Sequence, residues 1–319
     1  MEGDFMNILF SRVVVIFALL CVLISTIGCS KSADYIDFNK TQAVVPMDEN
    51  QEKEQRPLVI AVAAVISPKE TINCYRLIAQ HISEATGHST VLIQRKTYAE
   101  INMLLSNGEA DMAFLSTGSY SSYRGVNDIE LLAMAELGNE SLYKTDIIVN
   151  KDSDIYSFAD LEGRTFAFTD PLSFSGHIVV ADILHQENTT TERYFKRYFY
   201  TYNHDKSLWA VANHVADAAS IDSQIYEYAE IHTPELTDRI RIIAALNPAP
   251  TGPVVVRKNL PTAQKEQLRQ IFLQMNRDPE LAKAMQKLMI DRFVSPQPEL
   301  YIPLKKIYDR ISMDYENNV

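Results

Sequence analysis

The sequence predicts an α/β protein of two lobes, each with a mostly parallel sheet flanked by helices. The chain has 319 residues, of which 46% are hydrophobic, and that size suits two cores better than one. From Leu58 onward, short runs rich in Val and Ile alternate with segments whose apolar residues recur at helical spacing. The alternation is interrupted by strand-like segments and then begins again, which indicates a second lobe.

The first lobe begins with three apolar runs of strand length separated by helical patterns. The runs lie at residues 58–66, 90–94 and 110–116, and the helical patterns lie at residues 70–87 and from Thr97 to Gly108. Thr97 and Glu100 have the spacing of a capping box, which predicts a helix start there. Strands that alternate with helices in this way are typical of a parallel sheet.

The second lobe repeats this order. Strands are expected at residues 164–168, 195–202 and 217–221, and helices at residues 177–184, 207–215 and 223–231. Residues 131–137 and 145–150 are expected to be strands that cross between the lobes. A strand at residues 252–260, a long helical stretch at 262–290 and helices at 301–311 complete the chain. We expect lobe one at residues 57–147 and 250–319 and lobe two at 148–249, joined by a hinge of two crossings.

The N-terminal segment has the pattern of an export signal. Residues 13–27 are an uncharged apolar run preceded by Arg12, and the run is shorter than a membrane-spanning helix needs. A start at Met6 would fit this pattern better than Met1. The residues before Cys29 resemble a bacterial lipobox, which predicts a signal peptide over residues 1–28 and a lipid anchor on Cys29. The alternative is an ordinary signal peptide with an incidental cysteine. Residues 29–56 are polar and aperiodic, and we expect a flexible tether.

Composition excludes several functions. The formal net charge of -11 argues against nucleic-acid binding, which needs clustered Lys and Arg. Apart from Cys21 in the predicted signal peptide and Cys29 at the predicted anchor, the one cysteine is Cys74, which lies on an apolar helix face, so we expect a buried structural thiol. The sequence offers no Cys/His cluster with metal-ligand spacing, no nucleophile–base pair and no Gly-rich cofactor loop. We therefore expect no metal, no cofactor, no catalytic residues and no enzyme activity.

Small polar residues follow four of the predicted strands. Ligands of open parallel sheets bind at the carboxyl ends of the strands, where helix N-termini offer unpaired N–H groups to anions. The residues expected to face such a ligand are Ser116, Thr117, Ser173, Ser175, Gly176, His204, Asp222 and Ser223. Each position has a simpler interpretation, because Ser and Asp are common helix caps and His204 could lie on the surface. For Asp222, the functional interpretation is a carboxyl that accepts a hydrogen from a protonated oxyanion or a ligand amine.

Four stretches resemble the family of periplasmic binding proteins for phosphate, phosphite and phosphonates. They are residues 94–120, 161–184, 200–223 and 252–260. The resemblance implies a type II periplasmic-binding-protein fold in which Ser173, Ser175 and the adjacent helix N-terminus hold the ligand oxygens. It also implies that His204 and Tyr98 donate hydrogen bonds. Phe174 stands where relatives often have Thr, so this chain keeps the backbone N–H but loses a hydroxyl. Gly252 stands where a binder of aminoethylphosphonate would carry an acid, which argues for a ligand without an amine.

The function expected from these observations is capture of a small phosphorus oxyanion for the membrane permease of an ABC importer. The alternative is a sensory subunit that reports the oxyanion to a membrane histidine kinase. We expect an exported monomer, periplasmic or on the extracellular face, that is held to the membrane only through its lipid anchor.

Overall fold

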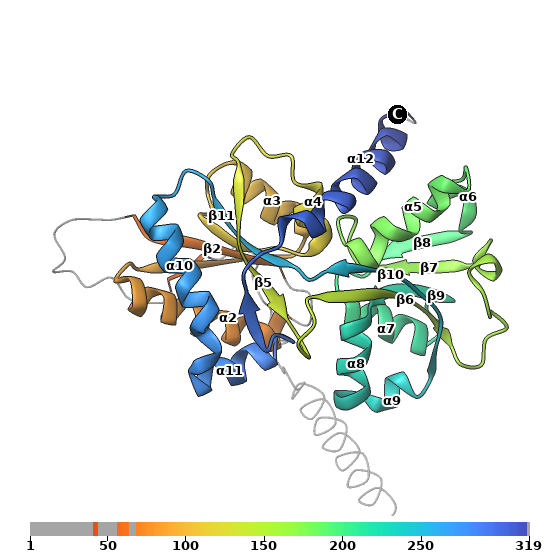
Figure 1. The fold of residues 1–319 in the computed structure, drawn as a ribbon. Helices are drawn as coiled ribbons and strands as arrows, with labels where there is room; N and C mark the ends of the chain where they lie inside the picture. The colour runs from red at the N-terminus through yellow and green to blue at the C-terminus, as the bar shows by residue number, and fades with distance from the viewer. Residues whose placement is uncertain (1–40, 44–55, 64–67, 318–319) are drawn as a thin grey trace, which may run out of the picture. The chain divides into compact units, whose positions relative to one another are not determined.

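The computed structural model describes residues 41–43, 56–63 and 68–317, all within one compact unit, residues 38–319 (Figure 1). These residues form two β-sheets flanked by helices, which confirms the predicted α/β class. No helix in this described part is both long and apolar enough to span a bilayer. The predicted signal peptide and Cys29 lie outside the described residues.

The larger sheet has seven strands in the order β1-β3-β2-β4-β11-β5-β12. Their bounds are β1 (Thr41–Ala43), β2 (Leu58–Ala63), β3 (Thr90–Arg95), β4 (Met112–Phe114), β5 (Ile129–Glu136), β11 (Pro253–Arg257) and β12 (Arg292–Val294). β2, β3 and β4 are parallel to one another, whereas β1, β11, β5 and β12 each pair antiparallel.

The smaller sheet has five strands in the order β10-β6-β9-β7-β8. Their bounds are β6 (Leu142–Asn150), β7 (Thr165–Phe168), β8 (Arg197–Tyr200), β9 (Ala218–Asp222) and β10 (Ile240–Pro250). β8, β7 and β9 are parallel, and β6 and β10 add antiparallel pairs. Both sheets are therefore mixed rather than mostly parallel as expected. Each keeps a parallel group of three strands, and the remaining strands pair antiparallel because they reach the sheet from a crossing or a terminal segment.

Helices cover both sheets. Those near the larger sheet are α2 (Pro68–Thr86), α3 (Tyr98–Ser106), α4 (Thr117–Ser122), α10 (Thr262–Gln274), η3 (Met275–Arg277), α11 (Pro279–Gln286) and η4 (Pro298–Tyr301). Those near the smaller sheet are η1 (Phe158–Leu161), η2 (Phe174–Ile178), α5 (Val179–Gln186), α6 (Thr191–Tyr194), α7 (His204–Ala212), α8 (Ser223–His232) and α9 (Pro234–Thr237). The chain ends with α12 (Ile302–Asn317).

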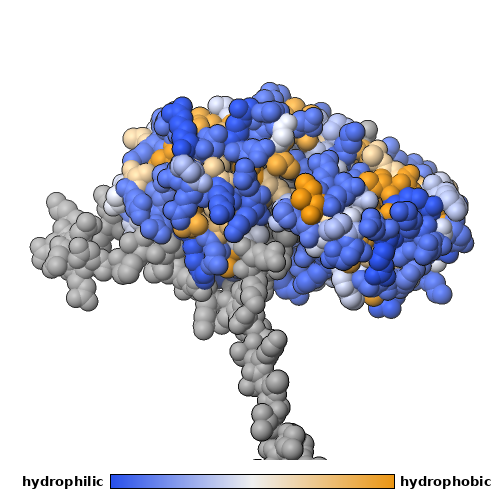
Figure 2. All heavy atoms as spheres, turned by 90° about the horizontal axis from the view of Figure 1, so that it is seen from below, coloured by the Kyte–Doolittle hydropathy of each residue, from blue (hydrophilic) through white to orange (hydrophobic). Residues whose placement is uncertain are grey.

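Successive side chains of a strand point to opposite faces of the sheet, and this explains why the sequences of the central strands are almost continuously apolar. Ile60 and Val62 of β2 face one hydrophobic core, and Ala61 and Ala63 face another on the opposite side of the sheet. Because both faces of a central strand are buried, every position is hydrophobic. The outer surface seen in Figure 2 is mainly hydrophilic, with hydrophobic residues in small separate groups.

Two crossings connect the sheets, from β5 to β6 and from β10 back to β11. They run side by side, since the Thr251 N–H donates to the Ser141 carbonyl at 3.0 Å and Pro250 pairs with Leu142. The Thr251 hydroxyl donates to the carbonyl of Ala135 at 2.6 Å. The Tyr301 hydroxyl donates to the carbonyl of Thr251 at 2.7 Å, which fixes the second crossing from a third segment of the chain.

The C-terminal helix α12 contacts elements beside both sheets. Leu304 and Ile311 are buried in a core of the smaller sheet, although the sequence places this segment in lobe one. Arg310 donates through Nε to the buried carboxylate of Asp182 on α5 at 2.7 Å. The preceding residue, Asp309, is paired with Arg124, which follows α4.

The segment expected to be a flexible tether contains a short strand. β1 pairs antiparallel with β3, with Gln42 opposite Leu92. The polar composition of residues 29–56 gives no sign of this strand, because an edge pairing uses backbone N–H and C=O groups that any sequence supplies.

Replacing Arg310 with Met should destabilise the protein, because the buried Asp182 carboxylate loses its charged partner. We expect the free energy of unfolding, measured by urea denaturation, to fall by about 1–3 kcal/mol. Arg277→Met is the matched control, since Arg277 is exposed and forms no ion pair with the described residues. Equal midpoints for the two variants would contradict the assigned role of Arg310.

Candidate ligand-binding site

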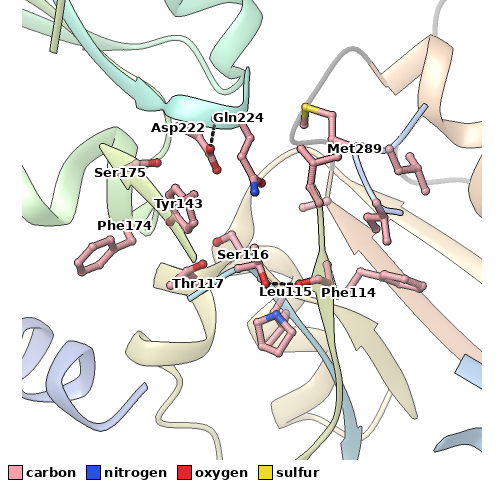
Figure 3. Close-up of a pocket in the computed structure, with 18 of the residues that line it drawn as sticks. Phe114, Leu115, Ser116, Thr117, Tyr143, Phe174, Ser175, Asp222, Gln224 and Met289 are labelled. Carbon is pink, nitrogen blue, oxygen red and sulfur yellow. Dashed lines mark hydrogen bonds between the residues drawn. The ribbon is translucent and has the colours of Figure 1, made fainter. Parts of the chain in front are cut away.

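A small cavity of about 130 Å³ lies where residues from both sheets meet (Figure 3). The smaller sheet and its helices supply Tyr143, Ser173, Phe174, Ser175, His204, Asp222 and Gln224. The side of the larger sheet supplies Ala63, Thr71, Tyr75, Tyr98, Phe114, Leu115, Ser116, Thr117, Ala135, Glu136, Leu137, Leu288, Met289, Ile290 and Phe293, and the second crossing supplies Thr251, Gly252 and Pro253. None of these described lining residues is Lys or Arg, so an anion bound here is held by neutral donors.

The turn after β7 is held by hydrogen bonds between its own residues. The Ser173 hydroxyl caps η2 by accepting the Gly176 N–H at 3.1 Å, and the Thr169 N–H donates to the Gly176 carbonyl at 3.0 Å. The buried Asp170 carboxylate accepts the Leu172 N–H at 2.8 Å. These bonds fix the backbone between the strand and the helix before any ligand is bound.

The same turn leaves backbone donors unused. Phe174 and Ser175 open the helix, and their N–H groups find no acceptor among the described residues. The helix dipole adds positive potential at this end. Figure 3 shows the Phe174 ring directed away from the middle of the cavity, and the ring is part of a core of the smaller sheet. The Phe174 side chain is therefore packed in the core, and its unpaired amide remains the group that the sequence assigns to a ligand.

Gly176 is needed for this geometry. A Cβ atom at this position would lie 2.5 Å from the Cβ of Thr169 and 2.8 Å from the Ser173 hydroxyl oxygen. Both neighbours are buried parts of the turn, so any larger residue displaces the cap itself.

His204 is buried at the start of α7 and is neutral. Burial lowers the pKa of His204 to about 3. Its Nδ1 accepts the Asp222 N–H at 3.3 Å, which places the ring hydrogen on Nε2. The residue therefore offers a ligand one N–H donor with no charge.

Asp222 ends β9 and caps α8. Its carboxylate accepts the Gln224 N–H at 2.9 Å, so the capping interpretation is correct, and the side chain also lines the cavity beside Ser175 and Tyr143 (Figure 3). Burial, with smaller contributions from Asp146 and Glu227, raises the pKa of Asp222 to about 7. Near neutral pH the carboxyl is therefore partly protonated and can donate a hydrogen bond to an anion.

Two buried tyrosines complete the polar side. Burial and the charge of Asp170 raise the pKa of Tyr98, so its phenol stays protonated. Burial also raises the pKa of Tyr143, although hydrogen bonds with Thr117 and Ser175 oppose the shift. The Tyr98 N–H donates to Asp170 at 3.2 Å and thereby links α3, beside the larger sheet, to the turn after β7.

The structure brings most of the predicted residues together. Those that line the cavity are Tyr98, Ser116, Thr117, Ser173, Phe174, Ser175, His204 and Asp222. Gly176 is not among the lining residues, but it shapes the turn that carries Ser173 and Ser175. Ser223 does not line this cavity: its hydroxyl accepts the Lys144 N–H at 3.1 Å and lines a neighbouring hollow. Ser116 caps α4, and the Thr117 hydroxyl donates to the Pro250 carbonyl at 2.7 Å.

Sequence reasoning missed several lining residues. Tyr143 and Glu136 stand beside the first crossing, and their position next to a predicted hinge was an available signal. Gln224 lies two positions after Asp222, which is a predicted site residue. The turn from Leu288 to Ile290 had no local signal, because the expected helix ran through it to residue 290.

Two mixed sheets joined by paired crossings, with a small cavity lined from both, define a substrate-binding protein. Residues 60–301 match the family described as ABC transporter, phosphonate, periplasmic substrate-binding protein, and the chain belongs to this family. That match confirms the resemblance seen in the sequence.

Individual relatives agree with this assignment. The chain is 28% identical over 171 residues to the phosphonates-binding periplasmic protein of Escherichia coli (strain K12). The aligned segment covers 52% of this chain and 50% of that protein. The chain thus matches about half the length of this curated relative. A binding component of an ABC phosphonate transporter from Pseudomonas aeruginosa has a TM-score of 0.71 at 23% identity, covering 81% of this chain and 88% of the other.

A second solved structure has the same fold. A protein from Prochlorococcus marinus (MIT 9301), in complex with methylphosphonate, has a TM-score of 0.72 at 16% identity and covers 81% of this chain and 99% of the other. Together these structures confirm the predicted type II periplasmic-binding-protein fold.

Replacing Gly176 with Ala should disrupt the site while leaving the sheets folded. The added Cβ displaces Ser173 and Thr169 and misaligns the Phe174 and Ser175 amides, so we expect the affinity of the site for an anionic ligand to fall at least a hundredfold, or about 2.7 kcal/mol. Isothermal titration calorimetry gives the affinity, and circular dichroism checks the fold. Gly163→Ala is the control for a glycine substitution away from the site, because a Cβ there meets nothing within 4 Å and the cost is confined to the strain of its own positive φ, which Gly176 does not have. Full affinity in Gly176→Ala would contradict the steric argument.

Proposed function

We propose that this chain captures a small phosphorus oxyanion, a phosphonate above all, and delivers it to the permease of an ABC importer. The observation that carries the proposal is the convergence of unpaired amides, hydroxyls and a neutral imidazole on one cavity. The family match favours import over the sensory alternative. We expect binding without turnover, since the described lining residues offer no nucleophile activated by a base.

The donors form a cradle for a tetrahedral anion. The amides of Phe174 and Ser175, the Ser175 hydroxyl and the His204 Nε2–H approach from the side of the smaller sheet. The Tyr98 phenol approaches from the side of the larger sheet, so a bound ligand would bond to both sides at once. Hydrogen bonds to a charged acceptor are about twice as strong as neutral ones, and a buried cavity strengthens them further.

Asp222 is suited to a ligand that can share one proton with its carboxyl group. In its protonated form the carboxyl donates to a ligand oxygen, and in its ionised form it accepts from a P–OH group. Either arrangement places one proton between the ligand and the protein, which removes the repulsion between two negative groups.

Closure of two lobes around the ligand is the proposed mechanism; since β6 (Leu142–Asn150) pairs wholly within the smaller sheet, the first boundary between the proposed lobes lies at its start rather than at residue 147. Direct contacts between the two sides support it. The Tyr98 amide bonds to Asp170, and the Lys96 ammonium lies 4.3 Å from the centre of the Tyr202 ring. Gly118 approaches so closely that a Cβ would lie 2.1 Å from the Leu172 carbonyl oxygen.

We also propose export and anchoring through the N-terminal segment. The support is the sequence pattern alone: an apolar run at residues 13–27 followed by a lipobox-like cysteine, Cys29. We expect a lipid-anchored monomer. Labelling with a radioactive or clickable fatty acid tests the anchor, and Cys29→Ala should abolish the label.

Removing single donors should weaken binding without unfolding the protein. For Ser175→Ala, His204→Ala and Tyr98→Phe, we expect each to reduce methylphosphonate affinity by about tenfold to a hundredfold, because each deletes a hydrogen bond to a charged group, worth about 1.5–3 kcal/mol. Calorimetry measures the affinity, and Ser312→Ala on α12, away from the cavity, is the control. If all three variants bound like the control, the site would be wrongly assigned.

Binding should depend on pH through Asp222. The pKa of about 7 means that the protonated donor is present below pH 7 and is replaced above it by a carboxylate that repels the anion. Affinity should therefore fall as pH rises above 7, by up to about tenfold per pH unit, and Asp222→Asn should lack this decline. The ratio of the two dissociation constants at each pH isolates the contribution of Asp222 together with the proton that it shares with the ligand. A ratio that is constant from pH 5.5 to 8.5 would exclude this role.

A further inference from the structure

The two sides of the cavity differ in chemistry. The side of the smaller sheet is polar, with Ser175, His204 and Asp222 among its lining residues. The side of the larger sheet includes a wall of apolar side chains from Leu288, Met289 and Ile290. A ligand with a charged end and an apolar end would satisfy both sides, whereas a symmetric inorganic anion would leave the apolar side without a partner.

The apolar wall is held in a fixed conformation. Met289 has a φ of +58°, which is unusual for a residue with a side chain, in a turn closed by the bond from the Ile290 N–H to the Met285 carbonyl at 3.0 Å. The next residues form β12, which pairs with β5 and places Arg292 opposite Glu136. Figure 3 shows Met289 across the cavity from Ser175 and Tyr143. The position of the wall on its own side of the cavity is therefore set by folded structure.

The carboxylate on this side of the cavity is already neutralised. Glu136 and Asp222 are the acidic residues among the described lining residues, and Glu136 is 8% exposed. Its carboxylate is ion-paired with the Arg292 guanidinium, which lies outside the cavity lining. A ligand ammonium placed beside Glu136 would have to compete with this pair while losing its own hydration.

We propose that the wall formed by Leu288, Met289 and Ile290 binds the carbon substituent of a phosphonate, and that this substituent is short and uncharged. This inference rests on the proposed function and names its ligand class: alkylphosphonates, in preference to inorganic phosphite or phosphate and to aminoalkylphosphonates. Met289 determines how long a substituent fits, and the Glu136–Arg292 pair excludes the amine. Each methylene that leaves water for this wall should improve affinity about threefold to fourfold.

The test uses two ligands of nearly equal size. Propylphosphonate and 2-aminoethylphosphonate differ at their last group, which is a methyl in one and an ammonium in the other. Calorimetry on the purified protein should give at least tenfold tighter binding for propylphosphonate, and phosphite should bind more weakly than methylphosphonate. Met289→Ala should weaken propylphosphonate binding about threefold to tenfold and leave phosphite unchanged.

Removing the guanidinium tests the role of the ion pair. In Arg292→Gln the Glu136 carboxylate is released, so the preference for propylphosphonate over 2-aminoethylphosphonate should shrink at least tenfold. Lys287→Gln removes an exposed positive charge next to the same turn and should leave the preference unchanged. If Arg292→Gln unfolds, the Met289→Ala comparison decides the proposal on its own.

The outcomes separate this inference from the function on which it rests. Tight binding of phosphite with no gain for any alkyl group, or binding of 2-aminoethylphosphonate as tight as that of propylphosphonate, would overturn the inference and leave oxyanion capture intact. Equal losses for phosphite and propylphosphonate in Met289→Ala would also overturn it. If no phosphorus oxyanion bound at all, the proposed function would fail, and the inference with it.

Discussion

A buried anion that meets no lysine or arginine must be stabilised by oriented dipoles, and this constraint organises the site. In the proposed site the unpaired amides of Phe174 and Ser175 would supply those dipoles, and the surrounding bonds from Ser173, Thr169 and Asp170 hold their turn in place. Because these bonds hold the backbone of the turn, the turn itself needs little reorganisation when a ligand binds. Neutral donors also suit a transported solute, which has to be released again.

The residues that shape the site also connect the two sides of the molecule. Asp170 uses one carboxylate oxygen to hold its own turn and the other to accept the Tyr98 amide from α3. His204 is oriented by the Asp222 N–H, so two predicted ligand contacts from different helices depend on each other. A substitution at one of them is therefore expected to affect its neighbour, and their contributions to affinity should not be additive.

Local signals in the sequence were sufficient for much of this structure. The positions of Ser173, His204 and Asp222 were predictable, because each residue lies where a strand gives way to a helix and these elements are neighbours in the chain. The same signal failed at Ser223, whose hydroxyl turns to the Lys144 amide, and no short-range pattern locates a partner on another strand. The antiparallel pairings, β1 and the Leu288–Ile290 turn likewise depend on contacts between distant segments. The pattern of hydrophobic residues sets which face is buried, whereas long-range pairing sets which neighbour it meets.

Two neighbouring residues of helix α12 form ion pairs with different sides of the molecule. Asp309 is bound to Arg124 beside the larger sheet, and Arg310 is bound to Asp182 beside the smaller one. A rotation of one sheet against the other must stretch one of these ion pairs or shift the helix along its axis. The two ion pairs therefore resist such a rotation, and salt weakens the exposed pair of Arg124 and Asp309 more than the pair with the buried Asp182. An environment-sensitive dye attached to the exposed face of α12 would change its fluorescence when the helix moves. The labelled protein would then report the binding of its ligand optically.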